Sequence, residues 1–479
     1  MSTDATAKGR HPSGPRTLHT ALVAGVAALG GFLFGFDTAV INGAVGAIET
    51  TFGPGSLLLG FSVASALLGC AAGAWFAGPL ANRYGRIRVM LMASLLFSVS
   101  AIGSAAALDI WSLTAWRVVG GLAVGAASVI APAYIAEIAP AGIRGRLGSL
   151  QQLAIVIGIF VALLSNYLIA TGAGGATEPL WLGADAWRWM FLAELVPAVA
   201  YGVLASRIPE SPRYLVLKER LTEARAVLDR FVGGDTEERL DEIRETLRSV
   251  RTPRLADLLG PRLGLLPIVW AGIGLSLFQQ LVGINVIFYY STVLWQSVGF
   301  SESDSFLITM ITSITNIAVT FIAIATVDKV GRKPLLLSGS VGMFAALTVM
   351  ALLFGNAPIV DDEPQLGPVA GPAALIAANV FVVCFGASWG PVVWILLGEM
   401  FSNRIRAAAI AVAAAAQWLA NFAVSTTFPV LSDVGLGLAY GIYATCAGLS
   451  IVFVAKAISE TKGKELEEMP ESSTTEAAR

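Results

Sequence analysis

The sequence predicts an all-α membrane protein with twelve transmembrane helices arranged as two six-helix bundles. Three observations support this fold class. Of the 479 residues, 56% are hydrophobic and only 13% are charged, whereas soluble domains carry about 25% charged residues. Long apolar segments recur along the chain, and short charged motifs of the first half return in the same order in the second. These features indicate a chain that lies largely in lipid.

Glycines, prolines and charged residues divide the apolar sequence into twelve expected spans. Each has about 20 residues or more, which is enough to cross a hydrocarbon core about 30 Å thick. The spans are expected at 18–43, 57–80, 88–108, 111–136, 148–170, 187–206, 264–297, 305–327, 334–355, 372–400, 406–430 and 436–456. Residues 1–17 are polar and carry no signal-peptide pattern, so we expect a disordered tail there and a second tail at 458–479.

Basic residues predict the orientation of the spans. The connections after the second, fourth, eighth and tenth spans hold most of the Lys and Arg residues near the spans, and the opposite connections hold mainly acids. Arg188, at the start of the sixth span, is an exception. Because basic connections stay in the cytoplasm, we expect both termini inside the cell and the protein in the plasma or inner membrane.

The chain contains two copies of one design. The matched motifs are NRYGRIR (82–88) with DKVGRKP (328–334), EIAPAGIR (137–144) with EMFSNRIR (399–406), and PESPRYL (209–215) with SETKGKEL (459–466). Three matches in one order indicate duplication. We therefore expect one bundle over 18–206, a second over 263–457, and a cytoplasmic linker of short amphipathic helices over 207–262. In such proteins the substrate site lies between the halves near the middle of the membrane.

Other function classes find little support in the sequence. The net charge of −2 argues against nucleic acid, and no phosphate loop, metal-ligand cluster or nucleophile–base arrangement is present. We therefore expect no enzyme activity, cofactor or metal. The three cysteines, Cys70, Cys384 and Cys446, lie far apart in apolar segments and are expected to be free thiols.

Polar residues inside the spans point to the substrate. Amides concentrate in the fifth, seventh, eighth and eleventh spans, with aromatic residues near them. An amide both donates and accepts hydrogen bonds, as a hydroxyl does, and aromatic faces suit the apolar face of a sugar ring. This pattern favours a neutral polyhydroxylated substrate, although a single amide can equally bond a neighbouring helix. Gly283 and the pair Gly390–Pro391 predict breaks in the seventh and tenth spans.

Two charged residues lie in the core of the first half. Asp37 is placed in the first span, where an aspartate costs about 2.5–3.5 kcal/mol at the centre of a helix. Arg117 lies in the fourth span and could offset that charge. A carboxylate that exchanges a proton for an arginine contact is a proton carrier. A structural salt bridge is the alternative interpretation.

The motifs together resemble those of the sugar porter family of the major facilitator superfamily, over residues 21–465. They include GFLFGFDTAVING, RVVGGLAVG, PESPRYL, QQLVGINVIFYYST, DKVGRKPLL and WGPVVWILLGEMF, and they look most like bacterial xylose–proton and glucose–proton symporters. The resemblance implies a sugar site formed by Phe34, Gln152, Gln279, Gln280, Asn285, Tyr290, Asn316, Phe385, Gly390, Trp394, Gln417 and Trp418. It also implies that Asp37 couples the proton and that Arg117 releases it.

The resemblance also assigns a role to the cytoplasmic charges. It implies a latch between the inner ends of the bundles, made by Arg83, Glu137 and Arg144 in the first half and by Arg332, Glu399 and Arg406 in the second. Glu210 and Glu460 are its outer partners. Asn82 stands where the superfamily motif often has Asp, so we expect a weaker latch in the first half than in the second, where Asp328 remains.

The expected function is import of a monosaccharide, a hexose or a pentose such as glucose or xylose, by proton symport through alternating access. A passive facilitator of the same fold and a symporter of a polyol or inositol remain alternatives. A drug–proton antiporter lacks support because the fifth span has no proline, and a sensor would need a longer cytoplasmic tail. The expected partners are the sugar, protons and the lipid bilayer, and we expect a monomer.

Overall fold

The computed structural model describes residues 15–140, 143–232, 236–249, 255–260, 264–360, 363–402 and 405–460. These residues include twelve helical segments long and apolar enough to cross a membrane, which confirms the predicted fold class. The first six spans are built from α1 (Pro15–Val40) with η1 (Ile41–Gly43), α3 (Ser56–Tyr84), α4 (Arg86–Ala105), α5 (Ile110–Ile138), α6 (Arg144–Ala173), and α7 (Ala186–Ala193) with α8 (Leu195–Ala205).

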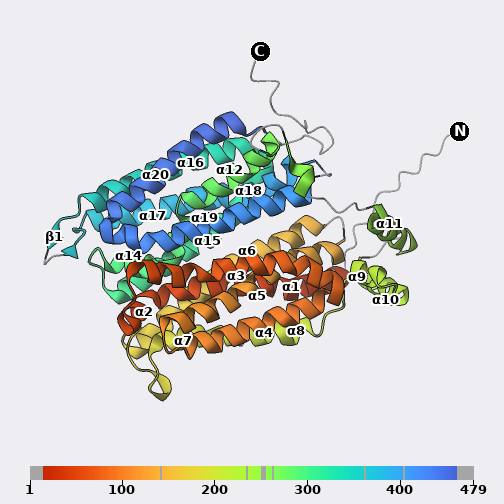
Figure 1. The fold of residues 1–479 in the computed structure, drawn as a ribbon, viewed down its shortest axis with the longest axis horizontal. Coiled ribbons are helices and arrows are strands. Elements are labelled where there is room, and N and C mark those ends of the chain that lie inside the picture. The colour runs from red at the N-terminus through yellow and green to blue at the C-terminus, as the bar shows by residue number, and fades with distance from the viewer. Residues whose placement is uncertain are drawn as a thin grey trace, which may run out of the picture.

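The second six spans repeat this order with more breaks. They are α12 (Pro267–Leu281) with α13 (Ile284–Tyr289) and α14 (Ser291–Gln296), α15 (Glu302–Val330), α16 (Arg332–Gly355), α17 (Ala370–Ala387) with α18 (Trp389–Met400), α19 (Arg406–Val434) and α20 (Leu436–Ala457). Figure 1 shows the two halves as layers of roughly parallel helices, one above the other.

Short elements connect the spans at both ends of the molecule. Between the halves lie α9 (Pro212–Leu217), α10 (Leu221–Val227), the π-helical turn η4 (Leu228–Val232), α11 (Thr236–Ser249) and η5 (Leu255–Leu258). We call the end of the molecule that carries α9, α10 and α11 the linker end (Figure 1). The opposite end, which we call the far end, carries α2 (Val45–Phe52), η3 (Trp181–Gly183) and the antiparallel pair β1 (Ile359–Val360) and β2 (Glu363–Pro364).

The chain start differs from the expectation in one respect. Residues 15–17 were expected in a disordered tail, but α1 begins at Pro15. Proline is favoured in the first turn of a helix, because its fixed backbone angle suits the helix and its missing N–H costs nothing there. Residues 1–14 and 461–479, which make up most of the two expected tails, lie outside the described residues.

Equivalent glycines turn the chain at the linker end of both halves. Gly85 separates α3 from α4 with φ of 100°, and Gly331 separates α15 from α16 with φ of 105°. Other residues rarely adopt such angles. The carboxylate of Glu210 also lies against Gly85, and that of Glu460 against Gly331, where a Cβ would meet them. The same turn with the same acid in each half supports the internal duplication.

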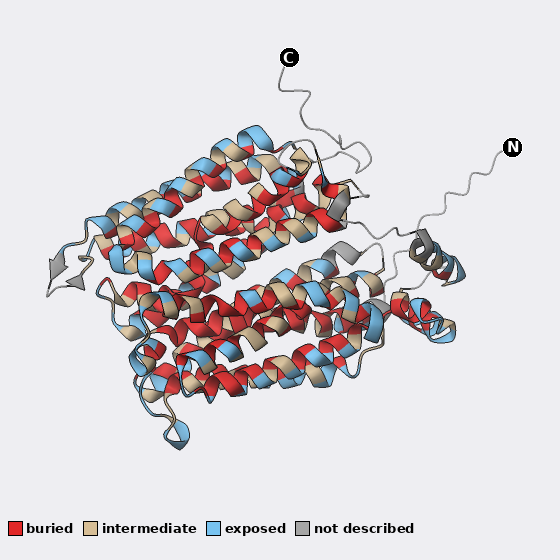
Figure 2. Ribbon diagram, in the orientation of Figure 1, coloured by how far each residue is buried: buried red, intermediate tan, exposed pale blue. Residues whose placement is uncertain are grey.

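Burial separates the interior of each half from its outer faces. Buried residues line the contacts between helices, and many exposed positions on the outer faces are large and apolar (Figure 2). Trp75 on α3 and Val196 on α8, for example, are 66% and 74% exposed. Exposed apolar side chains over so many long helices fit a surface that contacts lipid. The three cysteines are free thiols, as predicted.

The two halves touch each other mainly at the far end. There Asn42 of η1 donates from Nδ2 to the Phe288 carbonyl of α13 at 3.0 Å and accepts from the Thr292 backbone N–H of α14 at 3.3 Å. Ser56 of α3 also donates to the carboxylate of Asp433 on α19. At the linker end, the ion pairs between described residues each lie within one half or within the linker. The two halves are therefore joined at the far end, and the molecule is closed there.

Candidate functional site

Asp37 and Arg117 form an ion pair in the core of the first half, as the sequence suggested. The Arg117 NH1 group donates to Asp37 Oδ1 at 3.2 Å and to the Asp37 backbone carbonyl at 3.0 Å. Their side chains are 1% and 3% exposed. Asp37 Oδ2 and Arg117 Nε are buried without a hydrogen-bond partner in the described chain. One carboxylate oxygen is therefore free to carry a proton.

Glu194 belongs to the same cluster, and the sequence analysis did not single it out. It stands at the junction of α7 and α8, is 1% exposed and interacts electrostatically with both Asp37 and Arg117. An isolated acid within the apolar sixth span was the available signal. Arg117 is paired with Asp37, and among the described residues no hydrogen bond or ion pair joins Glu194 to either of them. The cluster contains two acids and one guanidinium, so its charges balance when it holds one proton.

Small residues allow the ion pair to form. Gly120, one turn after Arg117 on α5, lies so close to Asp37 that a Cβ there would be 2.8 Å from Asp37 Oδ1 and 2.6 Å from Ser100 Oγ. Ser100 of α4 donates to the Trp116 carbonyl at 2.8 Å. Even an alanine at position 120 would therefore press on the Asp37 carboxylate.

Three amides of the seventh span, Gln279, Gln280 and Asn285, make hydrogen bonds at the predicted breaks in the seventh and tenth spans. Gln279 Nε2 donates to the carbonyls of Trp389 at 2.9 Å and Gly390 at 3.3 Å, which are the first two residues of α18. Across the turn at Gly283, where φ is 80°, Asn285 Nδ2 donates to Gln280 Oε1 at 2.6 Å.

Several predicted sugar contacts gather around these breaks. The amide oxygens of Gln279 and Gln417 are buried and have no hydrogen-bond partner among the described residues. Asn316 of α15 lies next to Gly386, the residue after Phe385 in α17. Asn285, Asn316 and Phe385 are half-buried. The two unpaired amide oxygens can accept hydrogen bonds from a hydroxylated ligand.

Aromatic rings from the two halves meet between them. Phe34 of α1 and Trp418 of α19 have ring centroids 6.1 Å apart and an interplanar angle of 44°. Trp394 of α18 is 43% exposed, and Gln152 of α6 is also exposed, so both side chains remain accessible. These residues come from both halves, as a site between the halves requires.

At or beside two positions expected to contact the sugar, Tyr290 and Gln152, the structure shows contacts with the protein itself. The Tyr290 hydroxyl donates to the Ser425 carbonyl at 2.7 Å and its ring packs on Phe428, so the side chain is occupied within the second half. In the pair Gln151–Gln152, Gln151 is the buried member and lies against Gly31 of α1.

Three predicted latch residues of the second half, Arg332, Glu399 and Glu460, lie together at the start of α16. Arg332 makes two hydrogen bonds with Glu399, from NH2 to Oε1 at 2.8 Å and from Nε to Oε2 at 3.1 Å. Glu460 accepts from the backbone N–H groups of Arg332 and Lys333, both at 3.0 Å, and so caps the start of α16. Arg406 donates to the Phe401 carbonyl at 3.2 Å.

In the first half the structure places Arg86, and not the predicted Arg83, on Glu137. Arg86 donates to Glu137 from NH2 at 2.8 Å and from Nε at 3.0 Å, and Glu210 caps the start of α4. Arg83 is exposed in the last turn of α3 and lies over the Tyr84 ring. The reason is the glycine turn, because the residue after Gly85 matches Arg332 after Gly331. The side chain of Arg144 lies outside the described residues.

The chain is similar to known transporters over almost its whole length. It is 61% identical to a glucose transport protein of Synechocystis sp., over 94% of this chain and 96% of that protein. It is 38% identical to the D-xylose–proton symporter of Escherichia coli K12, over 93% and 94% of the two chains.

Among solved structures, the inward-open xylose transporter XylE from E. coli superimposes with a TM-score of 0.80 at 37% identity, over 94% of this chain and 99% of that one. XylE bound to 6-bromo-6-deoxy-D-glucose gives a TM-score of 0.75 at 36% identity, over 95% and 99% of the two chains. The family model described as "Sugar (and other) transporter" matches residues 23–472. The fold, the buried ion pair and these matches together show that the chain belongs to the sugar transporter family and is a multi-pass membrane transporter, not an enzyme.

Proposed function

We propose that this protein imports a monosaccharide together with a proton by alternating access. The observation that carries the proposal is the buried cluster of Asp37, Arg117 and Glu194 in one half, next to a site of amides and aromatic rings between the halves. The names of its relatives, a glucose transport protein and a D-xylose–proton symporter, support both substrates.

The proton would bind in the cluster of the first half. With two acids and one guanidinium in a site of low dielectric, the neutral state holds one proton, and losing it leaves an uncompensated charge. Asp37 Oδ2 has no competing hydrogen bond and is the oxygen we assign to the proton. Arg117 then keeps the deprotonated carboxylate stable after release.

The sugar would bind mainly in the second half. Gln279, Gln280, Asn285, Asn316 and Gln417 supply donors and acceptors, with Phe34, Phe385, Trp394 and Trp418 as aromatic faces and with Gln152, Tyr290 and Gly390 as further contacts. Among these, Gln280 and Asn285 flank the turn at Gly283, so a sugar that bonds both would also hold α13 relative to α12. Binding can in this way close the far part of the seventh span over the ligand.

The orientation follows from the basic residues and the position of the linker. We assign the linker end, with both termini, to the cytoplasm of the cell, and the far end to the outside. The contacts of Asn42 with α13 and α14 then close the outside, and the latch clusters of Arg86 and Arg332 lie inside. The TM-score of 0.80 with inward-open XylE agrees with this state.

The domain assignment follows the same scheme. Residues 18–206 and 263–457 would be the two transport bundles, and 207–262 the cytoplasmic linker. Since both bundles and both parts of the site belong to one chain, a monomer in the lipid bilayer is sufficient for transport.

Proton coupling would let the protein accumulate sugar. A membrane potential of 100 mV supplies about 2.3 kcal/mol for each charge that moves inward, which corresponds to about fiftyfold accumulation. A facilitator of the same fold would only equilibrate the sugar. It would need no buried carboxylate beside Arg117, and the cost of burying Asp37 would have no function.

Reconstituted liposomes test the proposal directly. Labelled glucose and xylose are offered outside, with and without an inward proton gradient, to the natural protein and to the Asp37→Asn variant. We expect gradient-driven accumulation of one sugar by the natural protein and only equilibration by the variant. Equal accumulation with and without the gradient, or no uptake of any monosaccharide, would refute the proposal.

A further inference from the structure

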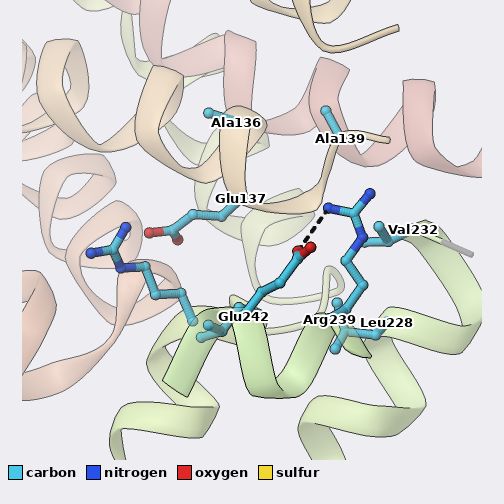
Figure 3. A pocket seen from close by; sticks show the side chains of 9 residues that line it. Ala136, Glu137, Ala139, Leu228, Val232, Arg239 and Glu242 are labelled. Carbon is cyan, nitrogen blue, oxygen red and sulfur yellow. Dashed lines mark hydrogen bonds and ion pairs between the residues drawn. The ribbon is translucent and has the colours of Figure 1, made fainter. Parts of the chain in front are cut away.

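A cavity lies at the linker end, between the last turn of α5 and the linker helices, far from the sugar and proton sites. It has a volume of about 400 Å³, within the range of about 300–1,000 Å³ that is typical of small-ligand pockets. Its apolar lining is formed by Ala136 of α5 and Ala139 directly after it, Leu228 and Val232 of η4, and Ile243 of α11. Figure 3 shows the labelled residues of α5 facing those of η4 and α11 across it.

Four charged side chains also line this cavity, and most of their charge is already paired. Glu137 is bound through both oxygens by Arg86, and it also accepts from the Ser211 hydroxyl. Glu242 lies 3.4 Å from the NH1 group of Arg239 (Figure 3). Both carboxylates that line the cavity therefore have a cationic partner, so the cavity offers nothing strong to a positively charged ligand.

Arg213 is the exception. It is half-buried in α9, in the PESPRYL motif, and it lines the cavity. Within the described part of the chain, its guanidinium makes no hydrogen bond, ion pair or ring contact. A second guanidinium, that of Arg239, is held only by a long contact, with 36% of its side chain exposed, and exposed pairs of this kind are weak. It can turn to another anion at little cost.

We propose that this cavity binds the phosphate group of a phosphate monoester. Guanidinium groups present planar forks of donors that match the oxygens of phosphate. Arg213 and Arg239 come from different helices, so they can hold a multiply charged tetrahedral anion from two sides. A carboxylate with one charge would use only one of them. The apolar lining suits the non-charged body of a monoester, and the monoester is either a soluble cytoplasmic metabolite or a lipid whose headgroup ends in phosphate.

Such a ligand would connect the linker to the transport bundle. Arg213 and Arg239 belong to the linker helices, whereas Ala136 belongs to α5, whose Glu137 holds the latch residue Arg86. Binding in the cavity therefore stabilises the packed arrangement of α9 and α11 against α5. This effect is independent of the sugar and the proton, so the proposal can be tested in the absence of transport.

The test uses full-length protein in nanodiscs of phosphatidylcholine. In one arm, inorganic phosphate and a hexose 6-phosphate are titrated by calorimetry. In the other, phosphatidic acid, whose headgroup is a phosphate monoester, replaces part of the phosphatidylcholine without any free phosphate, and the thermal unfolding midpoint is measured. A soluble ester predicts binding in the first arm, and a headgroup predicts stabilisation only in the second.

Three variants make the result decisive. Arg213→Gln removes the unpaired cation and should weaken binding about tenfold or more, the usual effect of losing a charge-assisted hydrogen bond. Ala136→Phe fills the cavity without changing any charge and should have the same effect. Arg230→Gln removes an exposed cation of η4 that does not line the cavity, and should leave binding unchanged.

Two results would overturn the proposal. One is that neither arm shows an effect with the natural protein. The other is an effect that Arg213→Gln and Ala136→Phe leave unchanged, since the phosphate would then bind elsewhere. Sugar binding by both variants serves as the check that they are folded.

Discussion

Phe34 and Trp418 face each other across the boundary between the two halves, with their ring centroids 6.1 Å apart. Phe34 is also three residues from Asp37, which places the two side chains about one turn apart on α1. The same helix therefore contacts the sugar region through an aromatic ring and holds the proton-carrying carboxylate. A small movement of α1 on sugar binding would therefore also move Asp37. This shared helix can couple sugar binding to binding of the proton.

The tight packing around Asp37 leads to the first prediction. Gly120→Ala should press a methyl group onto the Asp37 carboxylate and separate it from Arg117. Overpacking of this kind costs about 1–3 kcal/mol, and proton-driven uptake should fall more than sugar exchange. Transport in liposomes measures both. Gly25→Ala in α1, where a Cβ meets no atom within 4 Å, is the control and should transport normally.

The second prediction separates the two arginines of the first motif. Arg86→Ala leaves Glu137 without its cation in a site where only 13% of that side chain is exposed. Breaking a buried pair costs about 3–5 kcal/mol, so the thermal unfolding midpoint in detergent should drop clearly. Arg83→Ala removes the same charge from an exposed position and should change it little. Equal effects of the two substitutions would show that Arg86 does not stabilise this end.

The third prediction concerns closure of the far end. Asn42 is 1% exposed and bonds both α13 and α14. Asn42→Ala removes these bonds, each worth about 0.5–1.5 kcal/mol, and should open the far end more often. A cysteine introduced as Gly46→Cys, which faces Val293, should then react several times faster with a membrane-impermeant maleimide in a background without the native cysteines.

Two controls accompany that labelling. Thr50→Ala removes a hydroxyl that bonds only to Gly46 of its own helix, so it should not change closure. Leu182→Cys, at a position 96% exposed in η3, gives the reaction rate of a freely accessible thiol. If Asn42→Ala labels no faster than Thr50→Ala, Asn42 does not hold the far end closed.

The fourth prediction is a pH dependence of closure at the far end. Burial and the negative charge of Asp433 raise the pKa of Glu49 above its ordinary value of 4.5. Because Asp433 belongs to the other half, this pKa is higher when the far end is closed than when it is open. The closed state therefore binds the proton more tightly, and it is favoured as external pH falls.

Labelling of Gly46→Cys between pH 4.5 and neutrality, normalised to Leu182→Cys, measures this effect. The normalised rate should be lowest near pH 4.5 and should rise as the pH passes the raised pKa of Glu49. Glu49→Gln cannot lose a proton and should abolish the rise. A rise that persists in Glu49→Gln would assign it to another group.

Much of the fold could be predicted from hydropathy and the repeat, including the break at Gly283, but the break in the sixth span and the exact position of the break in the tenth could not. The tenth span breaks at Ser388 and the sixth at Glu194, each three residues before a proline. A proline clashes with the carbonyl four residues before it, and α17 and α7 end at those residues, Ala387 and Ala193. A proline alone does not determine whether a helix breaks, since Pro79, Pro132 and Pro429 lie within continuous helices.

Some residues of the candidate site can be recognised from the sequence, whereas the position of others depends on how the helices pack. Asp37 and Arg117 were found because a charge in an apolar span needs a partner. Glu194 carries the same signal, an acid within an apolar span, and only the fold shows that it lies near Asp37 and Arg117. In the pair Gln151–Gln152, only the packing of α6 against Gly31 decides which side chain is buried. The repeat already indicated Arg86, since Gly85 and Gly331 align it with Arg332.

The central claim is that Asp37 carries the proton that moves with the sugar. The most direct test is the external pH of lightly buffered, energy-starved cells that express the protein, while a panel of monosaccharides is added. We predict alkalinisation after one sugar, and its loss in Asp37→Asn while exchange of that sugar persists. Clear uptake of labelled sugar without any pH change would contradict the claim and identify a facilitator in which Asp37 and Arg117 form a structural pair.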